Sequence, residues 1–131
     1  HAAGMKLSVI ALLGIGGDRA HEHARLTAEL VTKMNPAYFS ALTVTVVPNT
    51  PLATLHAKGR FAVPPIEGLL GELRTMVDLA RPTHAVFRTN HASNYLPLRG
   101  TLPDDRERIV ALIDAALEGK VPLRPERMRA L

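Results

Sequence analysis

The chain has 131 residues, of which 47% are hydrophobic and 21% charged, and its net charge at pH 7 is +4. This composition is typical of one soluble globular domain or of part of a larger one. The chain has no cysteine, which excludes a disulfide, a thiolate nucleophile and a cysteine-held iron–sulfur cluster within it. Scattered basic residues and 4% aromatics do not favour nucleic-acid binding.

No apolar stretch of the sequence reaches the roughly 20 residues that cross a bilayer. No signal-peptide pattern with a basic start, an apolar middle and a cleavage site is present either. A cytoplasmic location is therefore expected. Residues 2–4, Ala2-Ala3-Gly4, precede Met5 and are interpreted as the end of a truncated helix. The alternative is that they were added in front of a natural start at Met5.

The first predicted element is a strand over residues 5–13, whose unbroken Val, Ile and Leu content predicts burial on both faces. The strand ends in three glycines and an aspartate: Gly14, Gly16, Gly17 and Asp18. A glycine turn between a buried strand and a helix suits an anionic or nucleotide-like ligand, and Asp18 is expected to accept hydrogen bonds from the first free amides of the helix. The dinucleotide fingerprint would need glycine where Arg19 stands, and the P-loop sequence is absent. A ligand site and a plain tight turn therefore both remain open.

Helices and strands alternate through the rest of the chain. The predicted elements are a helix over 19–34, a strand over 38–47, a short helix over 52–58, a helix over 66–79, a short strand over 84–89, a polar loop over 90–102 and a helix from about 103 to 118. This order predicts an α/β fold with a parallel three-stranded βαβ-type sheet and right-handed crossovers. Parallel sheets usually have both faces and edges protected. We therefore expect a slice of a larger sheet, a partial (β/α) TIM-like barrel over residues 1–119, followed by an Arg/Pro-rich extended tail over 120–131.

Three loops follow the carboxyl ends of the predicted strands, at residues 14–18, 48–52 and 90–100, and are expected to converge on one rim. The last loop is rich in small hydrogen-bonding groups, which makes four residues candidates for substrate binding: Asn90, His91, Ser93 and Asn94. His91 could transfer protons near neutral pH. Alternatively, these side chains satisfy the backbone of their own loop.

Other catalytic arrangements lack support in the sequence. His21 and His23 are two residues apart on a predicted helix, so they do not share a face and no metal site is expected. The serines lack the G-x-S-x-G pattern of serine hydrolases. Catalytic residues therefore stay unassigned.

Four short motifs follow one another along the chain. They are Gly14-Ile15-Gly16-Gly17-Asp18, Pro48-Asn49-Thr50-Pro51-Leu52, Lys58-Gly59-Arg60-Phe61, and the stretch from Asn90 to Leu98 followed by Gly100 and Leu102-Pro103-x-Asp105. Taken in order, these motifs resemble the C-terminal half of a radical S-adenosylmethionine barrel. The chain is most similar to the branch that contains the oxygen-independent coproporphyrinogen oxidase and the elongator catalytic subunit. The resemblance covers about residues 2 to 128.

The resemblance implies an S-adenosylmethionine site and a role in hydrogen abstraction by an oxidoreductase. The implied cofactor-bordering residues are Gly14, Gly16, Gly17 and Asp18, with Val47, Pro48 and Thr50 near the adenine, and the loop from Asn90 faces substrate. The family's C-x3-C-x2-C loop, which holds a 4Fe–4S cluster, is absent, so this chain alone is expected to be inactive. The expected partner is the missing N-terminal half of the barrel or a second copy of the chain, and the substrate is unknown. Gly16→Val is expected to abolish affinity for an adenosyl ligand.

Two other functions remain. The chain could be a stand-alone nucleotide- or S-adenosylmethionine-binding module of the Rossmann type, although methyltransferases of that type want an acidic residue where Leu12 stands and a glycine where Asp18 stands. It could also be a non-catalytic interaction protein that uses its Arg-rich tail. Deleting residues 120–131 distinguishes this last function from the others, because only an interaction protein of this kind is expected to lose partner binding while its fold stays intact.

Overall fold

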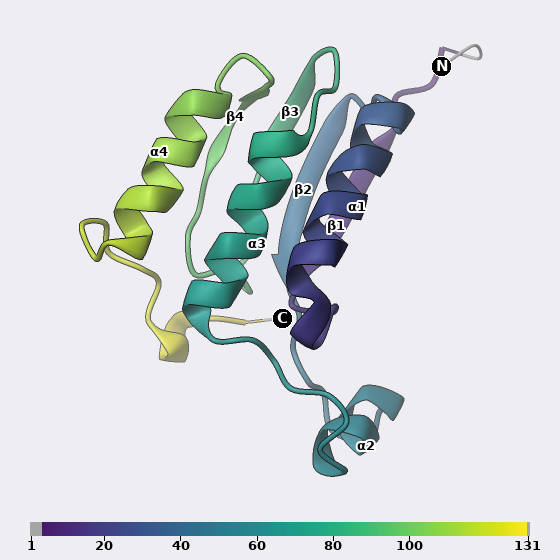
Figure 1. Ribbon diagram of the computed structural model, residues 1–131, viewed down its shortest axis with the longest axis vertical. Helices are drawn as coiled ribbons and strands as arrows, with labels where there is room; N and C mark the ends of the chain where they lie inside the picture. The colour runs from purple at the N-terminus through teal and green to yellow at the C-terminus, as the bar shows by residue number, and fades with distance from the viewer. Residues whose placement is uncertain (1–3, 131) are drawn as a thin grey trace.

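The part of the chain that the computed structural model describes, residues 4–130, forms one four-stranded sheet (Figure 1). The strands are β1 (Ser8–Leu13), β2 (Tyr38–Thr43), β3 (Ala85–Arg88) and β4 (Arg99–Leu102). They lie side by side in chain order, with β1, β2 and β3 parallel and β4 antiparallel to β3. The fold is therefore mixed α/β with a mostly parallel sheet.

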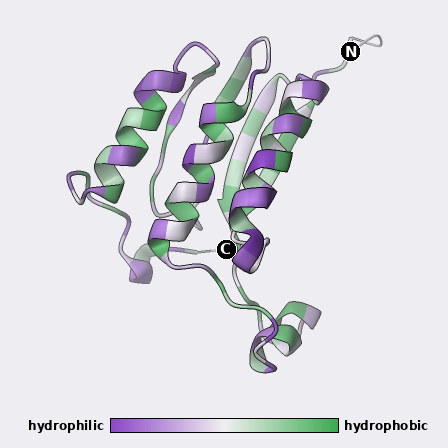
Figure 2. Ribbon diagram, in the orientation of Figure 1, coloured by the Kyte–Doolittle hydropathy of each residue, from purple (hydrophilic) through white to green (hydrophobic). Residues whose placement is uncertain are grey.

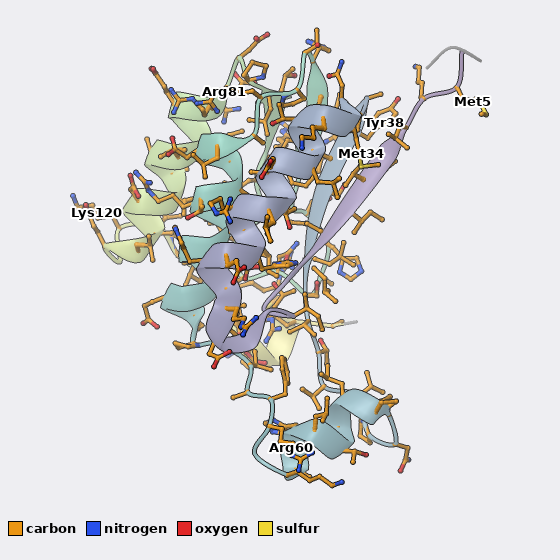
Figure 3. The ribbon with its side chains drawn as sticks, turned by 45° about the vertical axis from the view of Figure 1, so that its right-hand side comes forward. Met5, Met34, Tyr38, Arg60, Arg81 and Lys120 are labelled. Atoms are coloured by element: carbon orange, nitrogen blue, oxygen red, sulfur yellow. The ribbon has the colours of Figure 1, made fainter. Side chains whose placement is uncertain are left out.

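Three long helices form a single layer on one face of this sheet (Figure 1). They are α1 (Ala20–Met34), α3 (Ile66–Leu79) and α4 (Arg106–Leu117), with α3 in the middle and in contact with both neighbours. The short helix α2 (Pro51–Ala57) stands away from this body on an arm whose tip carries Arg60 (Figures 1 and 3). Two 3-10 turns complete the fold, η1 (Gly17–Arg19) and η2 (Glu126–Met128).

The core lies between the sheet and the helix layer. Alternate strand residues point into it, and the rings of Phe39 and Phe87 pack with their centroids 5.4 Å apart at an interplanar angle of 53°. Fully burying one such side chain contributes about 1.5–3 kcal/mol. The helices present apolar stripes to the same core and polar residues to the outside (Figure 2). One core therefore fixes the positions of all the strand ends.

The opposite face of the sheet is covered by no helix of residues 4–130, and we call it the open face. Burial in β1 alternates, and Ile10 on the open face is 65% exposed while Ala11 is buried. The expectation that the first strand is buried on both faces is therefore wrong for this chain. Its continuous apolar sequence reflects a hydrophobic open face rather than a covered one.

The sheet differs from the predicted one at two places. The second strand ends at Thr43 and not at 47, because the amide of Val44 donates to the carbonyl of Leu13 (2.8 Å) and β1 offers no further partner beyond it. The predicted loop over 90–102 contains β4, so the described sheet has four strands and not three. β4 is only four residues long and contains Gly100, which gives it no recognisable strand pattern.

The helices lie close to their predicted ranges, except that α4 begins at Arg106 and not near 103, because residues 103–105 form a turn before it. The helix predicted over 66–79 is α3 with the same bounds, and α1 ends as predicted at Asn35, which adopts a left-handed conformation with φ 48°. The prediction that Asp18 accepts hydrogen bonds from the first amides of the helix is wrong. Asp18 lies in η1, and no side chain caps either η1 or α1. The interpretation of Ala2-Ala3-Gly4 falls on residues outside those described, apart from Gly4. No helix of the described residues is long and apolar enough to cross a membrane.

Candidate functional site

The three loops at the carboxyl ends of β1, β2 and β3 contribute side chains to one cavity of about 340 Å³. Ile15 comes from the glycine loop, Val47 and Thr50 from the second loop, and His91 and Ser93 from the third. Aliphatic side chains also line it, from Leu12 in β1, Leu42 in β2 and Val44 directly after β2. We call this space the strand-end cavity. The predicted convergence of the three loops is thus confirmed for these residues.

Local structure holds the second loop in place. The hydroxyl of Thr50 donates to the carbonyl of Val47 (2.6 Å) and accepts from the amide of Ala53 (3.2 Å), so Thr50 caps the start of α2. Asn49 turns the chain with φ 64°, in the left-handed region. These contacts fix Val47 and Thr50 at the cavity wall, whereas Pro48 is exposed and lines none of the cavities described below.

His91 lines the strand-end cavity. Its Nδ1 atom accepts from the amide of Ser93 (3.1 Å) and lies 2.9 Å from the Ser93 hydroxyl. Since Nδ1 is an acceptor, the neutral ring carries its proton on Nε2. His91 can therefore donate one hydrogen bond to a ligand.

Asn94 has a structural role in the third loop. It is 2% exposed, its Nδ2 donates to the carbonyls of Ala41 (2.7 Å) and Thr89 (3.0 Å), and its Oδ1 accepts from the Thr43 hydroxyl (2.9 Å). The Ser93 hydroxyl likewise accepts from the amide of Thr43 (3.1 Å). The side chains of this loop are therefore engaged mainly with the chain's own backbone, which is the alternative that the sequence left open.

The glycine loop is shaped by packing within the chain. Gly14 has φ 89°, and a Cβ atom there would lie 2.9 Å from side-chain atoms of Leu69 and Val44. A Cβ atom on Gly16 would lie 2.9 Å from Cβ of His23. Gly16→Val would therefore disturb the start of α1 before it met a ligand, so the expected specific loss of adenosyl affinity does not follow from this geometry.

Glu72 on α3 is the residue at this site that the sequence analysis missed. Its side chain is 0% exposed, its Oε2 accepts from the amide of Gly14 (2.9 Å), and its Oε1 lies 2.5 Å from Nδ1 of His23 on α1. Glu72 thus ties the glycine loop to both helices. A signal was available, because Glu72 stands between Leu69 and Leu73 in the buried stripe of α3, where an acidic residue needs a partner.

The remaining candidates lie in other places. Gly16, Gly17 and Asp18 border a separate cleft of about 250 Å³ against residues 59–62. Asn90 borders another cleft, of about 300 Å³, beside Arg88 and Arg99. The predicted cofactor and substrate residues therefore do not form a single site.

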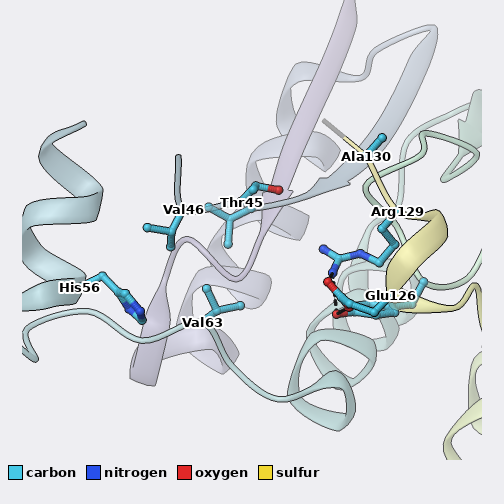
Figure 4. A pocket seen from close by; sticks show the side chains of 9 residues that line it. Thr45, Val46, His56, Val63, Glu126, Arg129 and Ala130 are labelled. Carbon is cyan, nitrogen blue, oxygen red and sulfur yellow. Dashed lines mark hydrogen bonds and ion pairs between the residues drawn. The ribbon is translucent and has the colours of Figure 1, made fainter. Parts of the chain in front are cut away.

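The C-terminal tail packs across the third loop. Nη1 of Arg124 donates to the carbonyls of His91 and Asn94, both at 2.9 Å, and Nε of Arg129 donates to the carbonyl of Ser93 (2.8 Å). The guanidinium of Arg129 also stacks 4.0 Å from the ring centroid of Tyr95. A cavity of about 520 Å³ separates this part of the tail from the α2 arm (Figure 4). The tail is thus part of the folded body, and its removal would expose the loop rather than leave the fold intact.

Docking of the tail is expected to depend on pH at both ends of the range. The hydroxyl of Tyr95 donates to Glu126, which with Arg129 lowers the pKa of Glu126 from 4.5. Because the pKa of Glu126 is lower in the docked state, its carboxylate stabilises the docked tail above pH 4.5. This stabilisation is lost as the pH falls through the pKa of Glu126 in the folded chain. Burial, then the bond to Glu126, raises the pKa of Tyr95 from 10.0, so that contribution is present below pH 10.0 and disappears as the pH rises through the folded value.

Hydrogen exchange of the Ala130 amide, which donates to the Ala92 carbonyl (3.1 Å), measures this docking. We expect faster intrinsic-rate-corrected exchange at both extremes. Glu126→Gln should abolish the increase in exchange at low pH and leave the increase at high pH. Exchange that is flat with pH in the unmodified chain would contradict the assignment.

No family model matches the chain, and neither a curated protein nor a solved structure matches it. The features of the molecule that bear on function are the strand-end cavity, the open face and the arrangement of the sheet.

Proposed function

We propose that this chain is the C-terminal part of a radical S-adenosylmethionine enzyme, and that its strand-end cavity takes the adenosyl group of that cofactor. The observation that carries the proposal is the meeting of three strand-end loops at one cavity. In parallel α/β folds, ligands bind beyond the carboxyl ends of the strands. Three of the four motifs quoted above occupy these three loops, in the order that the resemblance implies.

The lining of the cavity fits an adenosyl group. Aliphatic side chains such as Leu12 and Val47 suit the flat faces of an adenine ring, and Thr50 and His91 offer hydrogen bonds to a polar rim. A volume of about 340 Å³ is at the lower end of the range for small-molecule sites. Gly14, Gly16 and Gly17 do not contribute to this fit, because a Cβ atom at each of them would meet atoms of the chain itself.

Bound to a reduced iron–sulfur cluster, S-adenosylmethionine supplies a radical that abstracts hydrogen from a substrate. This chain has no cysteine, so the cluster ligands belong to another part of the enzyme. The residues described here bind and orient the adenosyl group, exclude water with aliphatic side chains, and hold one donatable proton at Nε2 of His91. The segment is inactive by itself.

The arrangement of the sheet also supports a barrel wall. β1, β2 and β3 lie in chain order, and the long helices cover a single face. A barrel places its helices on the outside in this manner, whereas a Rossmann sheet carries helices on both faces. The one-sided layer therefore favours the barrel over a stand-alone Rossmann-like module. The antiparallel β4 departs from the eight-stranded parallel pattern, and the missing half of the barrel would cover the open face and the unpaired edge of β1.

Calorimetric titration with adenosyl compounds tests the cavity. We expect S-adenosylmethionine, S-adenosylhomocysteine and adenosine to bind, and methionine alone not to bind. Leu12→Glu places a carboxylate at the cavity wall and should weaken adenosine binding at least about tenfold, because the bound adenosyl group would remove that charge from water without giving it a partner. Leu26→Glu is the matched control, since Leu26 is exposed on α1. Equal binding by both variants, or no adenosyl binding at all, would remove the proposal.

The radical chemistry has its own test. The reading frame upstream of His1 is expected to encode a C-x3-C-x2-C loop. Co-expression of that upstream segment with this chain should then give a complex with the absorption of an iron–sulfur cluster. An upstream frame without such a loop would leave adenosyl binding but remove the radical reaction.

A further inference from the structure

Two arginines face each other across β3 and β4 on the open face. Arg88 and Arg99 are register partners, and both are exposed. At the next step along the ladder, the amide of Thr89 donates to the carbonyl of Leu98 (2.9 Å). Since hydrogen-bonded and non-hydrogen-bonded pairs alternate, Arg88 and Arg99 form a non-hydrogen-bonded pair, in which the side chains lie closest. The fold therefore places two arginine residues directly opposite each other on the same face.

Nothing on the described part of the chain neutralises this pair. The strand positions that share the open face are apolar or uncharged: Ser8, Ile10, Leu12, Tyr38, Ser40, Leu42, Val86 and Thr101. No acidic side chain of residues 4–130 forms an ion pair with either arginine. Like charges directly opposite each other on a sheet are destabilising. The pair thus costs folding free energy that no ion pair within residues 4–130 offsets.

The two arginines also line a cleft of about 300 Å³, with Asn90, Pro97 and Leu98. A guanidinium presents a planar set of donors that fits a carboxylate or phosphate group at two points. The amide of Asn90 adds a further donor at the same cleft. An oxyanion placed between Arg88 and Arg99 would satisfy both forks and cancel their mutual repulsion.

We infer that the cleft formed by Arg88, Arg99 and Asn90 binds the oxyanion group, a carboxylate or a phosphate, of a small-molecule substrate. This assignment of substrate class rests on the proposed function, in which the open face lines the interior of the barrel. One row across the sheet runs from Ile10 through Ser40 to Arg88 and Arg99. The adenosyl group would thus lie over the β1–β2 side and the anionic end of the substrate over the β3–β4 side.

Titration of the unmodified chain with inorganic phosphate and, separately, with succinate tests the cleft at low ionic strength. Binding is followed by the side-chain Nε–Hε signals of the arginines in NMR spectra. We expect Arg88→Gln and Arg99→Gln each to weaken the tighter of the two ligands by about tenfold, the scale of one charge-assisted interaction. The ligand that binds more tightly identifies the group. Arg25→Gln, on the outer side of α1, is the control with the same change in charge.

A stability measurement separates a binding pair from two inert surface arginines. Without anion, Arg88→Gln or Arg99→Gln should raise the melting temperature, because either change removes the repulsion. With phosphate or succinate the order should reverse, since the unmodified chain gains more from the ligand. Arg88→Lys keeps the charge and loses the planar fork, so it should retain the repulsion and lose most of the affinity.

Three outcomes would overturn the inference: no binding of either anion, equal weakening by Arg25→Gln, or unchanged affinity in both cleft variants. These outcomes are distinct from failure of the proposed function, which is measured at the strand-end cavity with adenosine and Leu12→Glu. Adenosine binding without anion binding removes the cleft and keeps the adenosyl site. Anion binding without adenosine binding keeps the oxyanion cleft and removes its placement beside the cofactor.

Discussion

Glu72→Leu is expected to lower the free energy of unfolding by about 2–4 kcal/mol, the cost of stranding a buried donor and breaking a buried polar pair. Leucine fills a similar volume but accepts no hydrogen bond. The amide of Gly14 would lose its acceptor at 2.9 Å, and Nδ1 of His23 would lose the carboxylate at 2.5 Å. Urea denaturation monitored by circular dichroism measures the change.

Two further variants isolate the cause. Glu72→Gln keeps an acceptor for Gly14 and supplies a donor for His23, so its loss should stay near or below about 1 kcal/mol. Glu67→Leu alters an exposed carboxylate on the same helix and should change stability by no more than about 0.5 kcal/mol. If Glu72→Leu were as stable as the unmodified chain, Glu72 would not be the tie that holds the glycine loop.

Asn94→Leu is expected to lower the free energy of unfolding by about 3 kcal/mol, because it strands three buried partners at about 1 kcal/mol or more each. Those partners are the carbonyls of Ala41 and Thr89 and the hydroxyl of Thr43. Asn94→Asp should also destabilise, since its carboxylate would replace a donor that faces two carbonyl oxygens. The same urea titration measures both.

Asn90→Ala is the matched control for that prediction. Asn90 lies in the same loop but is exposed, so its loss should change stability by no more than about 0.5 kcal/mol. The comparison also decides between the two interpretations of the loop. An Asn94→Leu variant that is fully stable and impaired only in ligand binding would assign Asn94 to the substrate, against the structural role described here.

The helices could be predicted from the sequence because their signals are local. The apolar spacing from Ile66 to Val77 and the break at Arg81-Pro82 set the limits of α3, and Asn35-Pro36 ends α1. A strand carries less local information. β4 forms because residues 99–102 lie beside β3 in space, and only that pairing makes Arg99-Gly100-Thr101-Leu102 a strand.

The site was partly predictable for the same reason. The convergence of strand-end loops follows from the alternation of helix and strand, and it correctly brought Thr50, His91 and Ser93 to one cavity. Which polar groups remain available to a ligand depends on long-range contacts. The bonds of Asn94 to Ala41 and Thr43 span more than 50 residues, with sequence separations of 53 and 51, and no local pattern announces them.

Side chains alternate along β3 and β4, so that some residues pack in the core while others lie on the open face. Phe87 and Leu102 point into the core and hold the sheet to its helices, whereas Arg88 and Arg99 point to the open face. A substitution at Arg88 or Arg99 therefore changes what the cleft attracts without opening a hole in the core. Substitutions on the open face can therefore change which ligand the cleft binds while the packing of the core stays the same.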